Sequence, residues 1–254
     1  MKHLFATYDT SFLITLGLQY FINGMKLMLS LAALDQFKEK YGLEPGETQK
    51  YSSYMVLPWT PKIVYGIFID TFPICGSKKK SYLVILSLLQ AVSALFITLF
   101  PLPNVGSFVA ALITISFCSA VMDVVVDGLM VIQARKDPTN GSEDLQAYSW
   151  GLVSLGGVIG GSCGGYLIEY VGTLYVYAIV SAMSFILAAS SLLMKKSVEN
   201  TSEAEQAMSF CQRSKKNLKE IKRGLSIREL YRTLIFFLVL GAVVPSFGDF
   251  LYYY

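Results

Sequence analysis

The sequence predicts an all-α, polytopic membrane protein. Of its 254 residues, 54% are hydrophobic and only 15% are charged, and its mean hydropathy is +0.51, which is far from the composition of a soluble domain. The apolar stretches have about the 20 residues that a membrane-spanning helix needs. They lack the apolar/polar alternation of barrel strands, so helices are the expected elements.

Seven apolar stretches follow one another, and we expect each to span the membrane. They lie near residues 11–35, 51–71, 81–100, 107–132, 149–168, 173–194 and 233–254. The segment between the sixth and seventh apolar stretches, residues 195–232, is polar and basic. We therefore expect a six-helix transmembrane bundle over residues 1–194, a cytoplasmic linker over 195–232, and a seventh helix over 233–254 that is the truncated start of a second half.

The basic residues predict the topology. Sixteen of the 21 Lys and Arg residues fall at the N-terminus, between the second and third stretches, between the fourth and fifth, or in the linker. Positive charge accumulates on the cytoplasmic side of membrane proteins, so we expect the N-terminus in the cytoplasm. The net charge of +3 reflects this bias, and it indicates a lipid bilayer rather than nucleic acid as the partner.

Asp123 and Asp127 stand in the fourth stretch, after a run from Ser81 to Met122 without a charged residue. Burying one carboxylate at membrane depth costs roughly 3 kcal/mol, so two there require an aqueous path, a partner or a function. They share one helix face, roughly 25 and 31 Å into a helix that runs inward. Either one of them binds and releases a proton in a carrier cycle, or both pair with basic residues at the cytoplasmic end.

The fifth stretch carries glycines at four-residue spacing. They form two rows, Gly156, Gly160, Gly164 and Gly157, Gly161, Gly165. Small residues at this spacing let helices approach closely. Both rows therefore predict helix packing, and a hinge is the alternative.

A loop motif joins the second and third stretches. Gly66-Ile-Phe-Ile-Asp70 is followed, after a short insertion, by Gly76-Ser-Lys-Lys-Lys80, and this pattern resembles a loop motif of the major facilitator superfamily. In such a motif glycine permits close helix approach, and the basic run stays on the cytoplasmic side.

Arg135 lies about 12 Å along its helix from Asp127, which is too far for a direct pair. Asp70 is its expected partner, and an ordinary cytoplasmic anchor is the alternative. The candidates for a cytoplasmic gate are Gly66, Asp70, Gly76, Lys78, Lys79, Lys80 and Arg135.

Further segments narrow the resemblance to one family. Leu57-Pro-Trp-Thr-Pro-Lys62 precedes the loop motif, and Pro73 stands in its insertion. Together with Tyr20-Phe-Ile-Asn-Gly24, Asp123-Val-Val-Val-Asp127, Ser149-Trp-Gly151 and Pro245-Ser246, these segments look like the folate–biopterin transporter family of the major facilitator superfamily. They occur in the same order as in that family and cover nearly the whole chain, as an N-terminal half plus the seventh helix.

The resemblance implies a secondary active transporter of folates or pterins that works by alternating access, with H+ as the suspected coupling ion. Lys62, about 17 Å into its helix, is the candidate to receive the carboxylates of a folate's glutamate tail, and Trp59 to stack on a pterin ring. Alternatively, a neighbouring Asp neutralises Lys62. Asn23 and Lys26 are weaker candidates, since Lys26 can extend towards the outer surface.

The resemblance also implies about twelve helices, so a C-terminal half or a second copy is an expected partner. The alternative is a half-carrier without transport of its own that acts as a fragment or as an assembly or regulatory partner. An enzyme is not expected, because an Asp-x-x-x-Asp site for a Mg²⁺-bound diphosphate needs a second acidic cluster, which the other stretches lack. The single histidine, His3, is terminal, so neither a metal site nor a cofactor is expected.

Overall fold

The computed structural model describes residues 2–74, 77, 79–100, 102–195, 198, 219, 223 and 226–243. Its helices are α1 (Lys2–Thr7), α2 (Thr10–Asp35), α3 (Pro45–Val56), α4 (Lys62–Thr71), α5 (Lys80–Leu99), α6 (Val105–Ala134), α7 (Gly141–Tyr166), α8 (Thr173–Leu193) and α11 (Arg228–Val243). Among the described residues, an isolated bridge between Ile74 and Ser77 is the only β pairing. The predicted all-α class is confirmed.

Five of these helices are long and apolar enough to cross a membrane. They are α2 with the π-turn η1 (Gln36–Lys40), α5, α6, α7 with the π-turn η3 (Leu167–Val171), and α8. Their outward side chains include exposed apolar residues such as Ile85 and Val92 on α5, which suits a helix that faces lipid. The prediction of an integral, multi-pass membrane protein is confirmed.

The second predicted span is divided into two helices. α3 ends at Val56, a 3₁₀ turn η2 (Leu57–Trp59) follows, and α4 begins at Lys62. Pro58 and Pro61 explain the break, because proline has no N–H for the helix ladder and its ring clashes with the preceding turn. The break brings the side chains around Trp59 to the middle of the bundle.

Two further helices differ from their predicted bounds. α7 begins at Gly141, eight residues before the predicted start, and carries Glu143 and Asp144 in its first turn, where the helix dipole favours negative charge. α11 begins at Arg228, before the predicted position 233. The remainder of the predicted seventh span and most of the linker lie outside the described residues.

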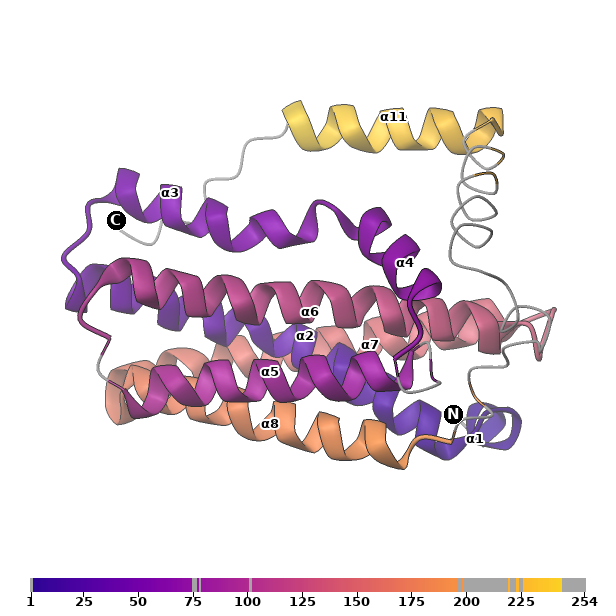
Figure 1. The fold of residues 1–254 in the computed structure, drawn as a ribbon, viewed down its shortest axis with the longest axis horizontal. Coiled ribbons are helices and arrows are strands. Elements are labelled where there is room, and N and C mark those ends of the chain that lie inside the picture. Colours follow the sequence, from indigo (N-terminus) through magenta and orange to yellow (C-terminus); the bar gives the residue numbers. More distant parts are fainter. Residues whose placement is uncertain are drawn as a thin grey trace.

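The five long helices lie side by side, and the connections alternate between the two ends of the bundle (Figure 1). α2 packs mainly against α7, and α5 packs against α8 and α6. One end of the bundle, on the right in Figure 1, gathers α1, the α4–α5 connection, the α6–α7 connection and the end of α8. This end, which we call the basic end, gathers segments that the positive-inside rule places in the cytoplasm.

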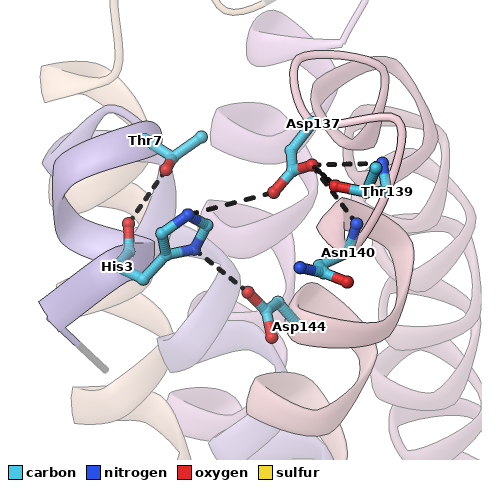
Figure 2. Close-up of polar contacts among 6 residues, drawn as sticks. All are labelled: His3, Thr7, Asp137, Thr139, Asn140 and Asp144. Atoms are coloured by element: carbon cyan, nitrogen blue, oxygen red, sulfur yellow. Dashed lines mark hydrogen bonds and ion pairs between the residues drawn. The ribbon is translucent and has the colours of Figure 1, made fainter.

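Polar contacts tie α1 to the start of α7 at the basic end (Figure 2). His3 lies 3.3 Å from Asp144 and 4.0 Å from Asp137. Asp137 accepts hydrogen bonds from the hydroxyl and backbone N–H of Thr139 and from the backbone N–H of Asn140. These bonds, that of the Thr139 hydroxyl first, lower the pKa of the Asp137 carboxyl.

A second connection at the basic end joins α2 to the end of α8. Asp9 caps α2 by accepting a hydrogen bond from the backbone N–H of Ser11, and the Lys195 ammonium donates to the same carboxylate over 2.8 Å. The lysine and the Ser11 contacts lower the Asp9 pKa to about 2. Asp9 is therefore a carboxylate at neutral pH and supports the start of α2.

One of the two glycine rows packs against α2. A Cβ at Gly156 would collide with the backbone carbonyl of Phe21 and would lie 3.2 Å from the Gly24 Cα. Gly160 and Gly164 make similarly close approaches to Met25 and Met28. In the other row, Gly161 faces only the Leu27 side chain, whereas Gly157 and Gly165 have no described neighbour within 4 Å.

Candidate functional site

The candidate site is a polar layer that begins where two apolar clusters of the bundle meet and extends on α6 to Asp123, beside Met122 and Val125 of one cluster. Along α2, Ile22 belongs to one cluster and Met25 to the other. A comparable gap occurs on α5 between Leu86 and Ala94, and on α6 between Ile115 and Cys118. The polar layer consists of Asn23, Lys26, Trp59, Lys62, Gln90, Ser116, Ser119 and Asp123.

Asp123 is the centre of this layer. Its carboxylate accepts a 2.6 Å contact from the Lys62 ammonium and a 2.8 Å hydrogen bond from the Asn23 side-chain amide. Lys62 is the first residue of α4, where the helix dipole disfavours a cation, so the carboxylate offsets an unfavourable position. The Asp123 side chain is 11% exposed and that of Lys62 is 36% exposed, so the pair is reached from the lysine side.

Trp59 carries both lysines of the layer on its ring. The Lys26 ammonium lies 3.9 Å from the ring centroid and the Lys62 ammonium 4.5 Å from it, which are cation–π distances. The indole N–H donates to the Ser116 hydroxyl over 3.1 Å, and Ser116 donates to the Met55 carbonyl over 2.5 Å. The indole N–H therefore fixes the edge of the Trp59 ring. A pterin ring that stacked on Trp59 would have to share the faces of the indole with the two ammonium groups.

Lys26 does not extend to the outer surface. Its Nζ is buried and has no hydrogen-bond partner among the described residues. Lys26, Gln90 and Ser119 line a small cavity between α2, α5, α6 and α8, whose other walls are apolar side chains including Met25 and Met183. Ser119 donates to the Gln90 side-chain carbonyl over 3.2 Å.

Asp127 has a different environment from Asp123. It accepts a short hydrogen bond from the Tyr20 hydroxyl, and within the described residues no basic side chain pairs with it. The two aspartates share one face of α6, as their spacing predicts, yet α4 supplies a cation to Asp123 alone.

The gate candidates at the basic end are placed as follows. Asp70 lies 4.0 Å from Lys79, and it forms no ion pair with Arg135, whose side chain is exposed. The Lys79 amine also lies against Gly128 of α6, 2.5 Å from where a Cβ would stand. Lys80 donates to the Met194 carbonyl over 2.6 Å. Gly66 approaches Val124 of α6, and Gly76 and Lys78 lie outside the described residues.

Gln90, Ser116 and Ser119 are members of the polar layer that the sequence does not single out. Each stands in the long uncharged run from Ser81 to Met122, where small polar residues in a span are often satisfied by their own helix. Only the packed bundle identifies them, because Gln90 and Ser119 meet across α5 and α6, and Ser116 meets Trp59.

Comparisons with known proteins fit this architecture. The probable folate-biopterin transporter 4 of Arabidopsis thaliana is 29% identical to the chain over 79% of the chain and 41% of its own length. A folate-biopterin transporter of Synechocystis sp. is 28% identical over 74% of the chain and 37% of its own length. Folate transporter 1 of Plasmodium falciparum is 22% identical over 92% of the chain and 44% of its own length.

The chain thus spans about two fifths of the length of these relatives. No solved structure matches it. The relatives are named as transporters, in agreement with the expectation that the chain is not an enzyme. The model of the BT1 family matches residues 23–254. This match covers nearly the whole sequence and confirms the resemblance to folate–biopterin transporters, so the chain belongs to the BT1 family.

Proposed function

We propose that the chain supplies the N-terminal half of a secondary active transporter of folates or pterins. The observation that carries this proposal is the polar layer, which places the Asp123–Lys62 pair and a second lysine within a bundle of helices that are long and apolar enough to cross a membrane. Ionisable side chains at this depth mark substrate or ion pathways. The relatives, which are named as folate or folate-biopterin transporters, supply the substrate class.

The proposed mechanism is alternating access. In a major facilitator arrangement the substrate site lies near the midplane between two six-helix halves, so a C-terminal half or a second copy would complete it. The basic end would then face the cytoplasm, where the Asp70–Lys79 contact and the approach of Lys79 to Gly128 hold α4 and α5 against α6. Opening of the cytoplasmic side would require this contact to separate.

Asp127 is the better of the two proposed proton carriers. Asp123 is paired with Lys62 and Asn23, and protonating it would leave the Lys62 ammonium without its counter-ion. Asp127 accepts from the neutral Tyr20 hydroxyl, so it can gain a proton without breaking an ion pair. A proton on Asp127 in one half of the cycle would couple transport to H+.

The proposal is tested by uptake of labelled folate and biopterin in cells that express the native gene product, beside cells that express these 254 residues. Uptake above that of empty cells supports the transporter, and the absence of uptake of both compounds contradicts it. If Asp127 carries the proton, Asp127→Asn abolishes the pH dependence of uptake while the protein still inserts. Tyr20→Phe is the matched control, because it removes the same hydrogen bond and keeps the carboxyl group.

A further inference from the structure

Lys26 is a buried cation without a counter-ion. Its Nζ has no hydrogen-bond partner among the described atoms, and it lies 3.9 Å from the centroid of the Trp59 ring. A buried ammonium that is not paired is strongly unfavourable, and a cation–π contact offsets only about 2 kcal/mol of that cost. The described part of the site therefore lacks a negative charge to balance Lys26.

The other charges of the layer are already matched. Lys62 lies 2.6 Å from one oxygen of Asp123, and Asn23 donates to the other oxygen. Asp127 is one helical turn further along α6 and is held by Tyr20. Among the described residues, two lysine Nζ groups lie over the Trp59 ring and one carboxylate pairs with them, and that carboxylate is bonded to Lys62 and not to Lys26.

The cavity beside Lys26 indicates which kind of group would enter. It is lined by the Lys26 side chain and by Gln90 and Ser119, and otherwise by apolar residues. No acidic side chain lines it. Its volume of about 10 Å³ is about the room of one water molecule, so it excludes a ring, and a carboxylate can enter only as the side chains around it move apart. A lysine beside a cavity that no described acidic side chain lines favours an anion there.

We infer that Lys26 binds a carboxylate of the transported substrate, whereas Lys62 stays paired with Asp123 and shapes the site. This inference rests on the proposed function and makes it more specific: the site selects a pteridine that bears a carboxylate over one that bears none. The substrate carboxylate completes the charge balance of the polar layer. The ring system of the substrate remains on the Trp59 and Lys62 side, where the layer is more exposed.

The first test is selectivity in the native gene product. Folate carries carboxylates and biopterin carries none, so Lys26→Met is expected to lower the ratio of folate to biopterin uptake at least tenfold. Lys26→Arg keeps the charge and is expected to keep most of the ratio. Lys62→Met is the matched control in the same layer, and it should lower both uptakes without changing the ratio. An unchanged ratio in Lys26→Met, or an equal change in Lys62→Met, overturns the inference.

The second test needs no transport and no variant of Lys26. The chain has two tryptophans and 16 tyrosines, and Trp150 is 66% exposed, so Trp150→Phe leaves Trp59 as the only tryptophan, which long-wavelength excitation selects over the tyrosines. Glutarate, a dicarboxylate that does not absorb near tryptophan, is expected to change Trp59 fluorescence with saturation in the purified protein. Its uncharged analogue glutaramide is expected to leave the fluorescence unchanged.

The two tests separate the inference from the proposed function. If the native product takes up neither folate nor biopterin, the proposed function fails, and the response to glutarate still decides whether Lys26 lies in an anion site. Equal responses to glutarate and glutaramide overturn that site. Sodium chloride at the same ionic strength tests whether a free inorganic anion binds instead. A fluorescence response to chloride equal to that to glutarate overturns the assignment to a substrate carboxylate.

Discussion

The polar layer and the basic end both hold oppositely charged side chains, but in different surroundings. In the layer, the Asp123 side chain is 11% exposed and stands among Met122, Val125 and other residues of one apolar cluster. At the basic end, His3 is 62% exposed and Asp144 38% exposed. The Asp123 carboxylate depends on its protein partners, since water reaches it far less than it reaches the basic end. At the basic end water can replace a protein partner, and the difference predicts how strongly each contact affects stability.

The largest effect is expected for breaking the ion pair in the layer. Lys62→Met leaves Asp123 without its cation, and loss of one partner of a buried pair costs about 3–5 kcal/mol. We expect a correspondingly lower free energy of unfolding, measured by titrating SDS into detergent micelles that hold the native gene product.

The double variant Lys62→Met with Asp123→Asn sharpens this prediction. It removes both charges and keeps the Asn23 contact with a neutral side chain, so it is expected to recover a large part of the stability that Lys62→Met loses. A double variant as unstable as the sum of the two single variants would contradict a direct pair.

A smaller loss of unfolding free energy is expected at Gly156, in the glycine row that packs against α2 and so positions the polar layer. Gly156→Leu places a side chain against the Phe21 carbonyl and Gly24, and overpacking of this kind typically costs about 1–3 kcal/mol. The shift of α2 would also displace Asn23 and Lys26, so substrate uptake should fall with stability.

Gly157→Leu is the matched control, one residue away on the same helix. No described atom lies within 4 Å of a Cβ at Gly157, so the folded bundle can accept the leucine. Equal destabilisation by the two substitutions, measured by the same SDS titration, would mean that the α2–α7 contact does not depend on the Gly156 row.

The sequence predicts the helical class, five of the spans and the family, because long apolar runs and ordered motifs are local features. It also predicts the shared face of Asp123 and Asp127, which follows from helical spacing. It offers a neighbouring Asp for Lys62 as one of two alternatives, but it cannot predict that this Asp is Asp123 or that Lys26 is left without a hydrogen bond among the described residues. That choice depends on the break at Pro58 and Pro61, which starts α4 at Lys62 and turns Trp59 towards both lysines.

The basic end is expected to respond more weakly. Asp9→Ala removes the cap of α2 and the contact with Lys195, and loss of such a cap costs about 1 kcal/mol. Asp9→Asn keeps a capping side chain and should lose less. The SDS titration at neutral pH distinguishes the two variants, and equal losses would assign the effect to the charge rather than to the cap.

The Asp9 contact also predicts a pH dependence. Its folded-state pKa is about 2, below the usual carboxyl value of 3.8, so the unfolded chain binds the proton more readily than the folded one. The stabilisation is complete above the usual value and is lost as the pH falls from there through about 2. Wild type and Asp9→Asn should therefore converge in stability over this range, and a constant difference between them would contradict the lowered pKa.

The smallest effect is expected for His3→Ala. His3 faces both Asp144 and Asp137, yet its side chain is mostly exposed, and ion pairs at such positions contribute little because water and salt screen them. Asp137 also keeps its bonds from Thr139 and Asn140 when the histidine is removed. The unfolding midpoint should therefore stay within measurement error at low and at high salt. A clear loss that salt abolishes would show that α1 is held to α7 by charge, and the basic end would then resemble the polar layer more closely than its exposure indicates.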